Sequence, residues 1–200
     1  MILEKARDIG SSVLLDESFY MLSYKSVCGP FRDTGEFLER YGNLYIIRSY
    51  TKSFALPGVR MGYVLTCPEN VRRLAGYLPE WNLSSLAASV MKACAKTVLE
   101  GDFLRASLDY IQAERQFLVR GLEGLGLKVY ESDTVFVLFK CVAGVDLYTA
   151  LLDRKILIRD CADLPGLGKG YYRVAVRCRK DNEQLINVIG EVLSEAVNGR

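Results

Sequence analysis

Short apolar runs alternate with amphipathic segments in the first third of the chain. Val13-Leu14-Leu15 runs directly into Asp16, and Leu44-Tyr45-Ile46-Ile47 ends shortly before Ser49. Such runs are typical of buried parallel strands whose functional side chains lie at their carboxyl ends. A further strand is predicted over residues 62–66, and helices over residues 1–10, 34–41 and 68–78; we expect Thr34 to cap the second helix and Gly42-Asn43 to end it in a left-handed turn. The pattern predicts an α/β fold with a mostly parallel sheet.

Two long helices follow, joined at a single glycine. The first runs from Ser84 or Ser85 to about residue 99, and after Gly101 the second runs from Asp102 to about residue 124. The remainder alternates strands, over residues 127–130, 135–139, 156–158 and 171–177, with helices, over residues 146–152 and 182–197. This order predicts a small α+β domain covered on one face. We therefore predict a domain at 1–100, which includes the start of the interdomain helices, and a second at 101–200.

Composition and charge exclude several classes of partner. Half of the 200 residues are apolar, and 26 basic against 24 acidic side chains leave a net charge of +2. No charge field indicates nucleic acid or an anionic membrane as a partner. Apolar runs fall short of the roughly 18 residues that cross a bilayer, and the first residues have no signal-peptide core. A cytoplasmic protein is expected.

Histidine is absent, and the cysteines are scattered. Without histidine, Ser-His-Asp and Cys-His catalysis, His-ligated zinc and imidazole general bases are excluded. The 6 cysteines form no C-x-x-C pair, so we expect reduced thiols packed mostly in the core, and no metal site. Any proton transfer must fall to Lys, Asp, Glu, Tyr or Cys.

Candidate chemistry gathers around the second strand. A pyridoxal phosphate enzyme needs a lysine that forms an imine, donors to the cofactor phosphate, and a carboxylate that keeps the ring nitrogen protonated. Lys52 could supply the imine, Ser49, Thr51 and Arg60 the phosphate donors, and Asp16 the carboxylate. Each residue alone has an ordinary explanation, as a solvated lysine, a helix cap or a surface ion pair. Together, in this order, they are far less easily accidental.

The same segments resemble the fold-type I pyridoxal phosphate enzymes, the class I/II aminotransferases. Within them the chain looks most like the group of histidinol-phosphate aminotransferases and threonine-phosphate decarboxylases. The matching segments are Asp16-Glu17-Ser18-Phe19, Ser49-Tyr50-Thr51-Lys52, Pro57-Gly58-Val59-Arg60-Met61-Gly62-Tyr63, Trp81-Asn82-Leu83-Ser84 and Tyr172-Arg173-Val174-Ala175-Val176-Arg177. The resemblance implies the C-terminal part of such an enzyme: part of the large cofactor-binding domain, with its mostly parallel sheet, plus the small α+β domain.

The resemblance also implies roles for single residues. Lys52 would form the Schiff base and move protons, and Asp16 would pair with the ring nitrogen of the cofactor. The cofactor phosphate would be bound by Ser49, Thr51 and Arg60. Arg173 would bind the substrate α-carboxylate, which suits a planar bidentate donor. Arg159 stands where related enzymes contact the substrate's phosphate. The alternative, an ordinary arginine without a role in binding, stays open. Arg177, four residues after Arg173, would lie roughly 13 Å from it along a strand, which favours a surface or ion-paired arginine.

Two departures from the family pattern shape the expected function. Phe19 replaces a tyrosine usual in histidinol-phosphate aminotransferases, which leans the resemblance towards the decarboxylase branch. The segment that precedes Asp16 in the family is missing, so exposed apolar surface and self-association, as a homodimer, are expected. We predict a pyridoxal phosphate-dependent enzyme acting on a small amino acid or amine, phosphate-bearing, through Lys52; the alternatives are threonine-phosphate decarboxylase or a catalytically incomplete fragment.

A nucleotide-binding α/β protein has little support. The glycine-rich segment Gly166-Leu167-Gly168-Lys169-Gly170 lacks the spacing of a phosphate-binding loop and follows no convincing strand.

Overall fold

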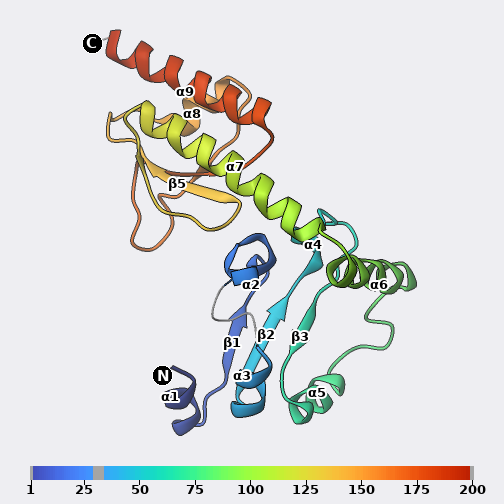
Figure 1. Cartoon of the computed structure of the whole chain (residues 1–200). Helices are drawn as coiled ribbons and strands as arrows, with labels where there is room; N and C mark the ends of the chain where they lie inside the picture. The colour runs from blue at the N-terminus through green and yellow to red at the C-terminus, as the bar shows by residue number, and fades with distance from the viewer. Residues whose placement is uncertain (1, 29–33, 199–200) are drawn as a thin grey trace. The chain divides into compact units, whose positions relative to one another are not determined.

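The chain forms two compact units, residues 1–107 and 108–200, in a computed structural model that describes residues 2–28 and 34–198 (Figure 1). The division falls within helix α7 (Phe103–Gly124), shortly after helix α6 (Ser85–Glu100). Both long helices agree with their predicted bounds to within a residue.

The first unit contains a small sheet with the strand order β1 (Val13–Asp16), β2 (Leu44–Arg48), β3 (Tyr63–Leu65). Strands β1 and β2 are parallel, with Val13 opposite Leu44, whereas β3 runs antiparallel to β2, with Ile46 opposite Leu65. Parallel strands need a long crossover, usually through a helix. Between β2 and β3 the chain forms only the one-turn helix α4 (Tyr50–Ser53), so it returns antiparallel.

One face of this sheet is packed and the other is partly open. Tyr41, Leu44 and Ile46 form a buried cluster on the packed face. On the opposite face Leu14 is 65% and Val64 41% exposed. The predicted exposure of apolar surface is confirmed at these residues, whereas the self-association that it favours stays a prediction. The other helices of the unit are α1 (Ile2–Asp8), the 3-10 turn η1 (Tyr20–Leu22), α2 (Lys25–Cys28), α3 (Gly35–Arg40) and α5 (Pro68–Ala75).

The bounds of α3 agree with the predicted helix to within a residue, but the predicted capping interactions are wrong. Thr34 lies at the N-terminus of α3, but its backbone is already helical (φ −78°, ψ −10°) and its side chain makes no capping hydrogen bond. Neither Gly42 nor Asn43 has a positive φ. The chain leaves α3 through Tyr41 in an extended conformation, and the Asn43 side chain donates to the Ser11 carbonyl at 3.0 Å. Tertiary contact therefore ends this helix, where a local turn was expected.

The second unit contains an antiparallel sheet with the order β4 (Lys128–Val129), β5 (Phe136–Lys140), β7 (Tyr171–Ala175), β6 (Arg159–Asp160). Helices α7, α8 (Leu147–Asp153) and α9 (Arg179–Asn198) pack on one face, as predicted for this α+β unit (Figure 1). The core consists of alternate strand residues and the apolar faces of the helices, including Leu118, Leu122, Val137, Phe139, Leu147, Leu151, Tyr172, Val174 and Ile189. The intervening residues, Arg173 among them, lie on the other face.

The strand predicted over residues 156–158 is displaced to Arg159–Asp160. Lys155 has a positive φ of 62°, and the Ile156 N–H donates to the Leu151 carbonyl at 2.9 Å. The chain is therefore still completing the C-terminal turn of α8 when the apolar run begins. The apolar pattern reflects burial of Ile158 in the core, without strand pairing.

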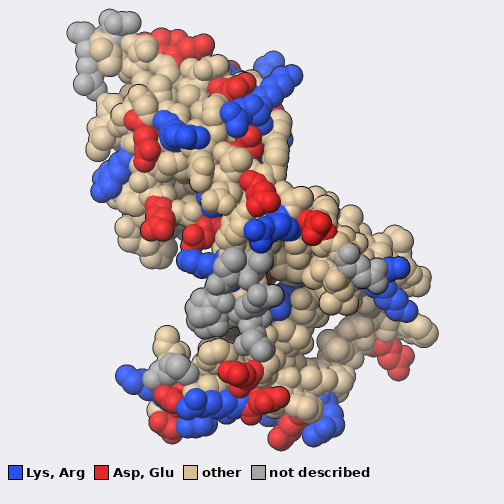
Figure 2. All heavy atoms as spheres, viewed as in Figure 1, with Lys and Arg blue, Asp and Glu red and all other residues tan. Residues whose placement is uncertain are grey.

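Charged side chains of both signs are mixed on the surface (Figure 2), and most of the described cysteines are buried or half-buried. Figure 2 shows Lys and Arg interspersed with Asp and Glu over the visible face. Cys94, Cys141 and Cys161 are buried, Cys67 is half-buried and Cys178 is exposed, and all are free thiols; the side chain of Cys28 lies outside the described residues. Within residues 2–28 and 34–198, no three or more acidic or cysteine side chains form a group that could hold a metal ion. No helix in that part is long and apolar enough to cross a membrane.

Candidate active site

The predicted phosphate donors Ser49 and Thr51 lie together at the start of α4. Ser49 has extended backbone dihedrals (φ −140°, ψ 130°), and its Oγ accepts the Thr51 N–H at 3.3 Å, which caps the helix. The two hydroxyl oxygens are 2.6 Å apart, and the Ser49 hydroxyl also donates to the Met61 carbonyl at 3.3 Å. The last contact ties the turn that carries Arg60 to the end of β2.

Asp16 and Lys52 are neighbours across the carboxyl ends of the two parallel strands. Asp16 accepts the Ser18 N–H at 2.9 Å; hydrogen bonds from Ser18, and then the charge of Lys52, hold the pKa of the Asp16 carboxyl below its usual range. The Lys52 ammonium is exposed and lies 5.5 Å from the centre of the Phe19 ring. A strand end, a short turn and a helix cap thus bring a carboxylate, an amine and two hydroxyls to one edge of the sheet.

Arg60 has an unusual backbone. Its φ of 54° lies in the left-handed region, and its guanidinium donates to the Pro57 carbonyl at 3.3 Å. The side chain is exposed and bonded back to its own turn. No contact places it against Ser49 or Thr51, although the Met61 contact brings its backbone beside them.

Sequence reasoning missed a buried ion pair directly behind these residues. Glu17 follows β1 and is 8% exposed, and its carboxylate accepts from Arg48 Nε, at the end of β2, at 2.8 Å. The Arg48 guanidinium lies 5.1 Å from the Tyr20 ring centre. Burial opposes the charge of Arg48, but the Glu17 hydrogen bond and charge outweigh it and raise the pKa of Arg48. An acid and an arginine ending two neighbouring parallel strands was the signal that could have revealed this pair.

An aromatic cluster supports the one-turn helix from behind. The Tyr50 ring lies 5.6 Å from that of Phe54 and 5.3 Å from that of Tyr63. Burial, followed by the charge and hydrogen bond of Tyr63, raises the pKa of Tyr50 to about 12, so this phenol stays protonated. Lys52 thus stands on a helix whose other side is anchored in the core.

Gly62 is the position in this turn where a side chain does not fit. A Cβ there would approach the Arg48 carbonyl oxygen to 2.8 Å, a backbone atom that cannot move aside. We expect Gly62→Ala to lower the free energy of unfolding by about 1–3 kcal/mol, measured by urea denaturation. Gly58→Ala is the matched control, because a Cβ at Gly58 meets nothing within 4 Å. Equal stability of the two variants would contradict the prediction.

The second unit carries a cavity of about 650 Å³ lined by Arg159, Arg173 and Arg177. Arg173 and Arg159 are opposite each other on β7 and β6. The Arg173 guanidinium lies 4.5 Å from the Phe136 ring centre. Arg159 Nη2 donates to both carboxylate oxygens of Asp163, at 2.7 and 2.9 Å. The structure thus brings the two predicted substrate arginines together.

The expectation of an ion-paired surface arginine at Arg177 is confirmed. Its side chain forms an ion pair with Asp181, with the two atoms 2.6 Å apart, as expected for a surface arginine. It also lines the same cavity as Arg173, two residues after the end of β7 at Ala175.

Comparisons with known proteins agree with this architecture. The family model described as "Aminotransferase class I and II" matches residues 1–192. A histidinol-phosphate aminotransferase of Caldanaerobacter subterraneus subsp. tengcongensis is 34% identical over 96% of this chain and 51% of its own length. The threonine-phosphate decarboxylase of Salmonella typhimurium is 28% identical over 96% of this chain and 52% of its own length.

Solved structures show the same relation. The crystal structure of the histidinol-phosphate aminotransferase from Clostridium acetobutylicum aligns with a TM-score of 0.85 at 26% identity, covering 97% of this chain and 57% of that one. The chain spans about half the length of the curated relatives it matches. With the family model matching nearly every residue, the chain belongs to the class I and II aminotransferases, a family that uses pyridoxal phosphate.

Proposed function

We propose that this chain carries the lysine anchor and the substrate-anion pocket of a pyridoxal phosphate-dependent enzyme acting on a small, phosphate-bearing amino acid or amine. The observation that carries the proposal is the gathering of Asp16, Ser49, Thr51 and Lys52 at one sheet edge. These residues come from two strands and a capped turn, and they supply the amine, carboxylate and hydroxyls that the cofactor needs.

The residues present fit the cofactor chemically. Lys52 would bond it through an imine, and Ser49, Thr51 and Arg60 would donate to its phosphate. Buried Ser53 Oγ, one residue after Lys52, has no hydrogen-bond partner among the residues that the structure describes, so this turn has an unused hydroxyl as well. When bound, the cofactor supplies an electron sink for the substrate α-carbon.

The chain's own residues would then do two things. Asp16, whose pKa is lowered, stays ionised at neutral pH and can hold a proton on the ring nitrogen by its charge. Lys52 would move the proton at the substrate α-carbon, since it offers an exposed amine, a base of suitable type, on the capped turn next to Asp16.

The substrate would be held by arginines of the second unit. Arg173 is proposed to bind the α-carboxylate and Arg159 the substrate phosphate, both lining one cavity. The named relatives act on histidinol phosphate or threonine phosphate, which both bear a phosphate group. A homodimer is proposed on the exposed apolar surface around Leu14 and Val64.

Decarboxylation is the second candidate. Phe19, in place of the tyrosine usual in histidinol-phosphate aminotransferases, has its ring centre 5.5 Å from the Lys52 ammonium, so this chain lacks a phenol at that point. A third possibility is a catalytically incomplete fragment, because the chain spans about half the length of its relatives.

A spectral titration tests the proposal. Pyridoxal phosphate is added to the purified chain, and imine absorbance is followed together with the elution volume on size-exclusion chromatography. We expect a saturable imine band in a dimer-sized peak; no band at any cofactor concentration would refute cofactor binding by this chain. Threonine phosphate, and histidinol phosphate with a 2-oxo acid, then separate release of carbon dioxide from transfer of the amino group.

A further inference from the structure

We propose that Arg177 is a third anion-binding residue of the second unit's cavity and that Asp181 is the counter-ion which an anionic ligand displaces. This inference rests on the proposed substrate cavity around Arg173 and Arg159, and it names a further residue of that site. Residue spacing along an extended strand places Arg177 roughly 13 Å from Arg173. The proposed role of Arg177 therefore needs the cavity itself, which both arginines line.

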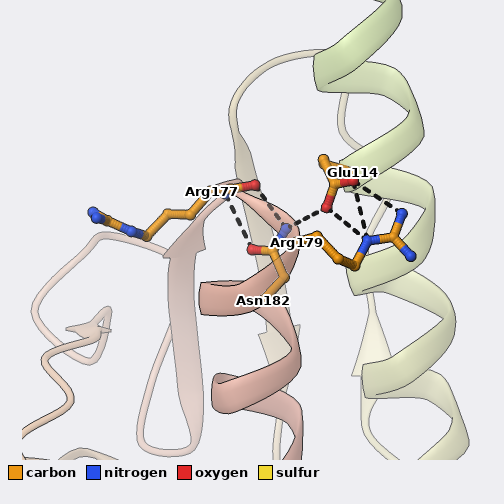
Figure 3. Close-up of polar contacts among 4 residues, drawn as sticks. All are labelled: Glu114, Arg177, Arg179 and Asn182. Carbon is orange, nitrogen blue, oxygen red and sulfur yellow. Dashed lines mark hydrogen bonds and ion pairs between the residues drawn. The ribbon is translucent and has the colours of Figure 1, made fainter.

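The backbone of Arg177 is held by a single side-chain amide. The pairing of β7 with β5 ends at Ala175, and the Val176 N–H donates to the Val135 carbonyl at 2.8 Å. At Arg177 the N–H donates to Asn182 Oδ1 at 3.1 Å, and the carbonyl accepts from Asn182 Nδ2 at 2.8 Å. Both backbone polar groups of Arg177 are therefore bound to Asn182, at the start of α9 (Figure 3).

Asn182 is itself held by a buried carboxylate. It is 1% exposed, and its Nδ2 also donates to Glu114 Oε2 on α7 at 3.1 Å. Glu114 is 5% exposed and accepts from Arg179 Nη2 at 2.9 Å and from Arg179 Nε at 3.1 Å. These hydrogen bonds, from Arg179 and then from Asn182, lower the pKa of the Glu114 carboxyl and keep it ionised.

The hydrogen-bonded pair of Glu114 and Asn182 therefore fixes the position of the Arg177 backbone, from which the side chain extends. Buried, fully bonded polar groups have a single favourable arrangement, because any shift leaves one of them without a partner. Figure 3 shows the Arg177 side chain extending away from this network. It lines the cavity together with Asp181.

The charge pattern of the cavity indicates what Arg177 does. Arg159 and Arg177 each pair with an aspartate four residues later, whereas Arg173 pairs with no carboxylate in the described part of the chain. The Arg177–Asp181 pair is open to water, with 69% of the arginine side chain exposed. Exposed pairs of this kind are weak and easily exchanged. A phosphate or carboxylate offers the same planar guanidinium an equally good acceptor, with more charge in the case of phosphate.

Binding of two probes to the full chain tests the proposal. Inorganic phosphate and O-phosphoserine are titrated calorimetrically into the wild-type chain and variants. We expect Arg177→Ala to weaken binding of O-phosphoserine about fivefold to tenfold. Asp181→Asn should tighten it about threefold, because the competing carboxylate is removed. Arg154→Ala, which breaks the Arg154–Glu195 pair outside the cavity, should change nothing.

A double-mutant cycle tests the positioning by Glu114. Glu114→Gln should weaken binding in the wild-type background and have no further effect in Arg177→Ala, since a purely structural role would lower affinity equally in both. If Arg173→Ala abolishes binding while Arg177→Ala and Asp181→Asn stay within twofold of wild type, the inference is overturned and the proposed cavity stands. If the wild-type chain binds neither probe, both the inference about Arg177 and the proposed substrate cavity are refuted.

Discussion

Replacing Lys52 with alanine is expected to abolish the imine absorbance that pyridoxal phosphate develops with this chain. The imine needs a primary amine beside the bound cofactor, and Lys52 stands on the capped turn next to Asp16. Loss should be complete, because the bond cannot form without the amine. The measurement is the visible spectrum, followed by borohydride reduction and mass spectrometry to locate the modified lysine.

A matched control separates this effect from general lysine chemistry. Lys92 is exposed on α6, and Lys92→Ala should retain the full band and the reduced adduct on Lys52. An adduct spread over several lysines, or a band that survives in Lys52→Ala, would refute the assignment of Lys52.

Replacing Glu17 with alanine is expected to destabilise the first unit strongly. The Glu17 carboxylate is the ion-pair partner of Arg48, whose side chain is 17% exposed. Removing it leaves a desolvated guanidinium without its counter-charge, and Arg48 Nη2 already lacks a hydrogen-bond partner within residues 2–28 and 34–198. Breaking a buried pair in this way costs about 3 kcal/mol or more. Urea denaturation followed by circular dichroism measures the loss.

An exposed ion pair provides the comparison. Asp8→Ala removes the partner of Arg7, where both side chains are more than half exposed, and should change the free energy of unfolding by less than about 1 kcal/mol. The double replacement of Glu17 and Arg48 by methionine and leucine should recover most of the lost stability, because no buried charge remains. Equal effects of Glu17→Ala and Asp8→Ala would show that the Glu17 pair contributes no more than a surface pair.

Features that depend on a few neighbouring residues were predictable. Ser84 caps α6 by accepting the Ala87 N–H at 3.1 Å, and Asp146 caps α8 by accepting two N–H groups, from Tyr148 and Thr149. The strand runs at β1 and β2 are confirmed to within a residue. Caps and apolar runs are local, so they are legible in the chain. The motif around Lys52 is local as well, which is why the family resemblance held.

Features that depend on residues far apart in the sequence could not be predicted from the sequence. Thr34 stands at a helix start but does not cap it, and the run at 156–158 packs into the core without pairing. Glu17 and Arg48 meet only because β1 and β2 are parallel neighbours. Arg177 lines the cavity, and both of its backbone polar groups are bonded to the side chain of Asn182, five residues later on α9.

By itself the sequence determined the order of the longer helices and of the strands, a serine cap at residue 84 or 85, and the family to which the segment from Ser49 to Tyr63 points. Tertiary structure decided the direction of β3, the buried pair behind the lysine turn, and the third arginine of the cavity. The physical reason is the same in each case. Local hydrogen bonds and side-chain periodicity act over a few residues, whereas burial and ion pairing depend on which segments the fold brings together.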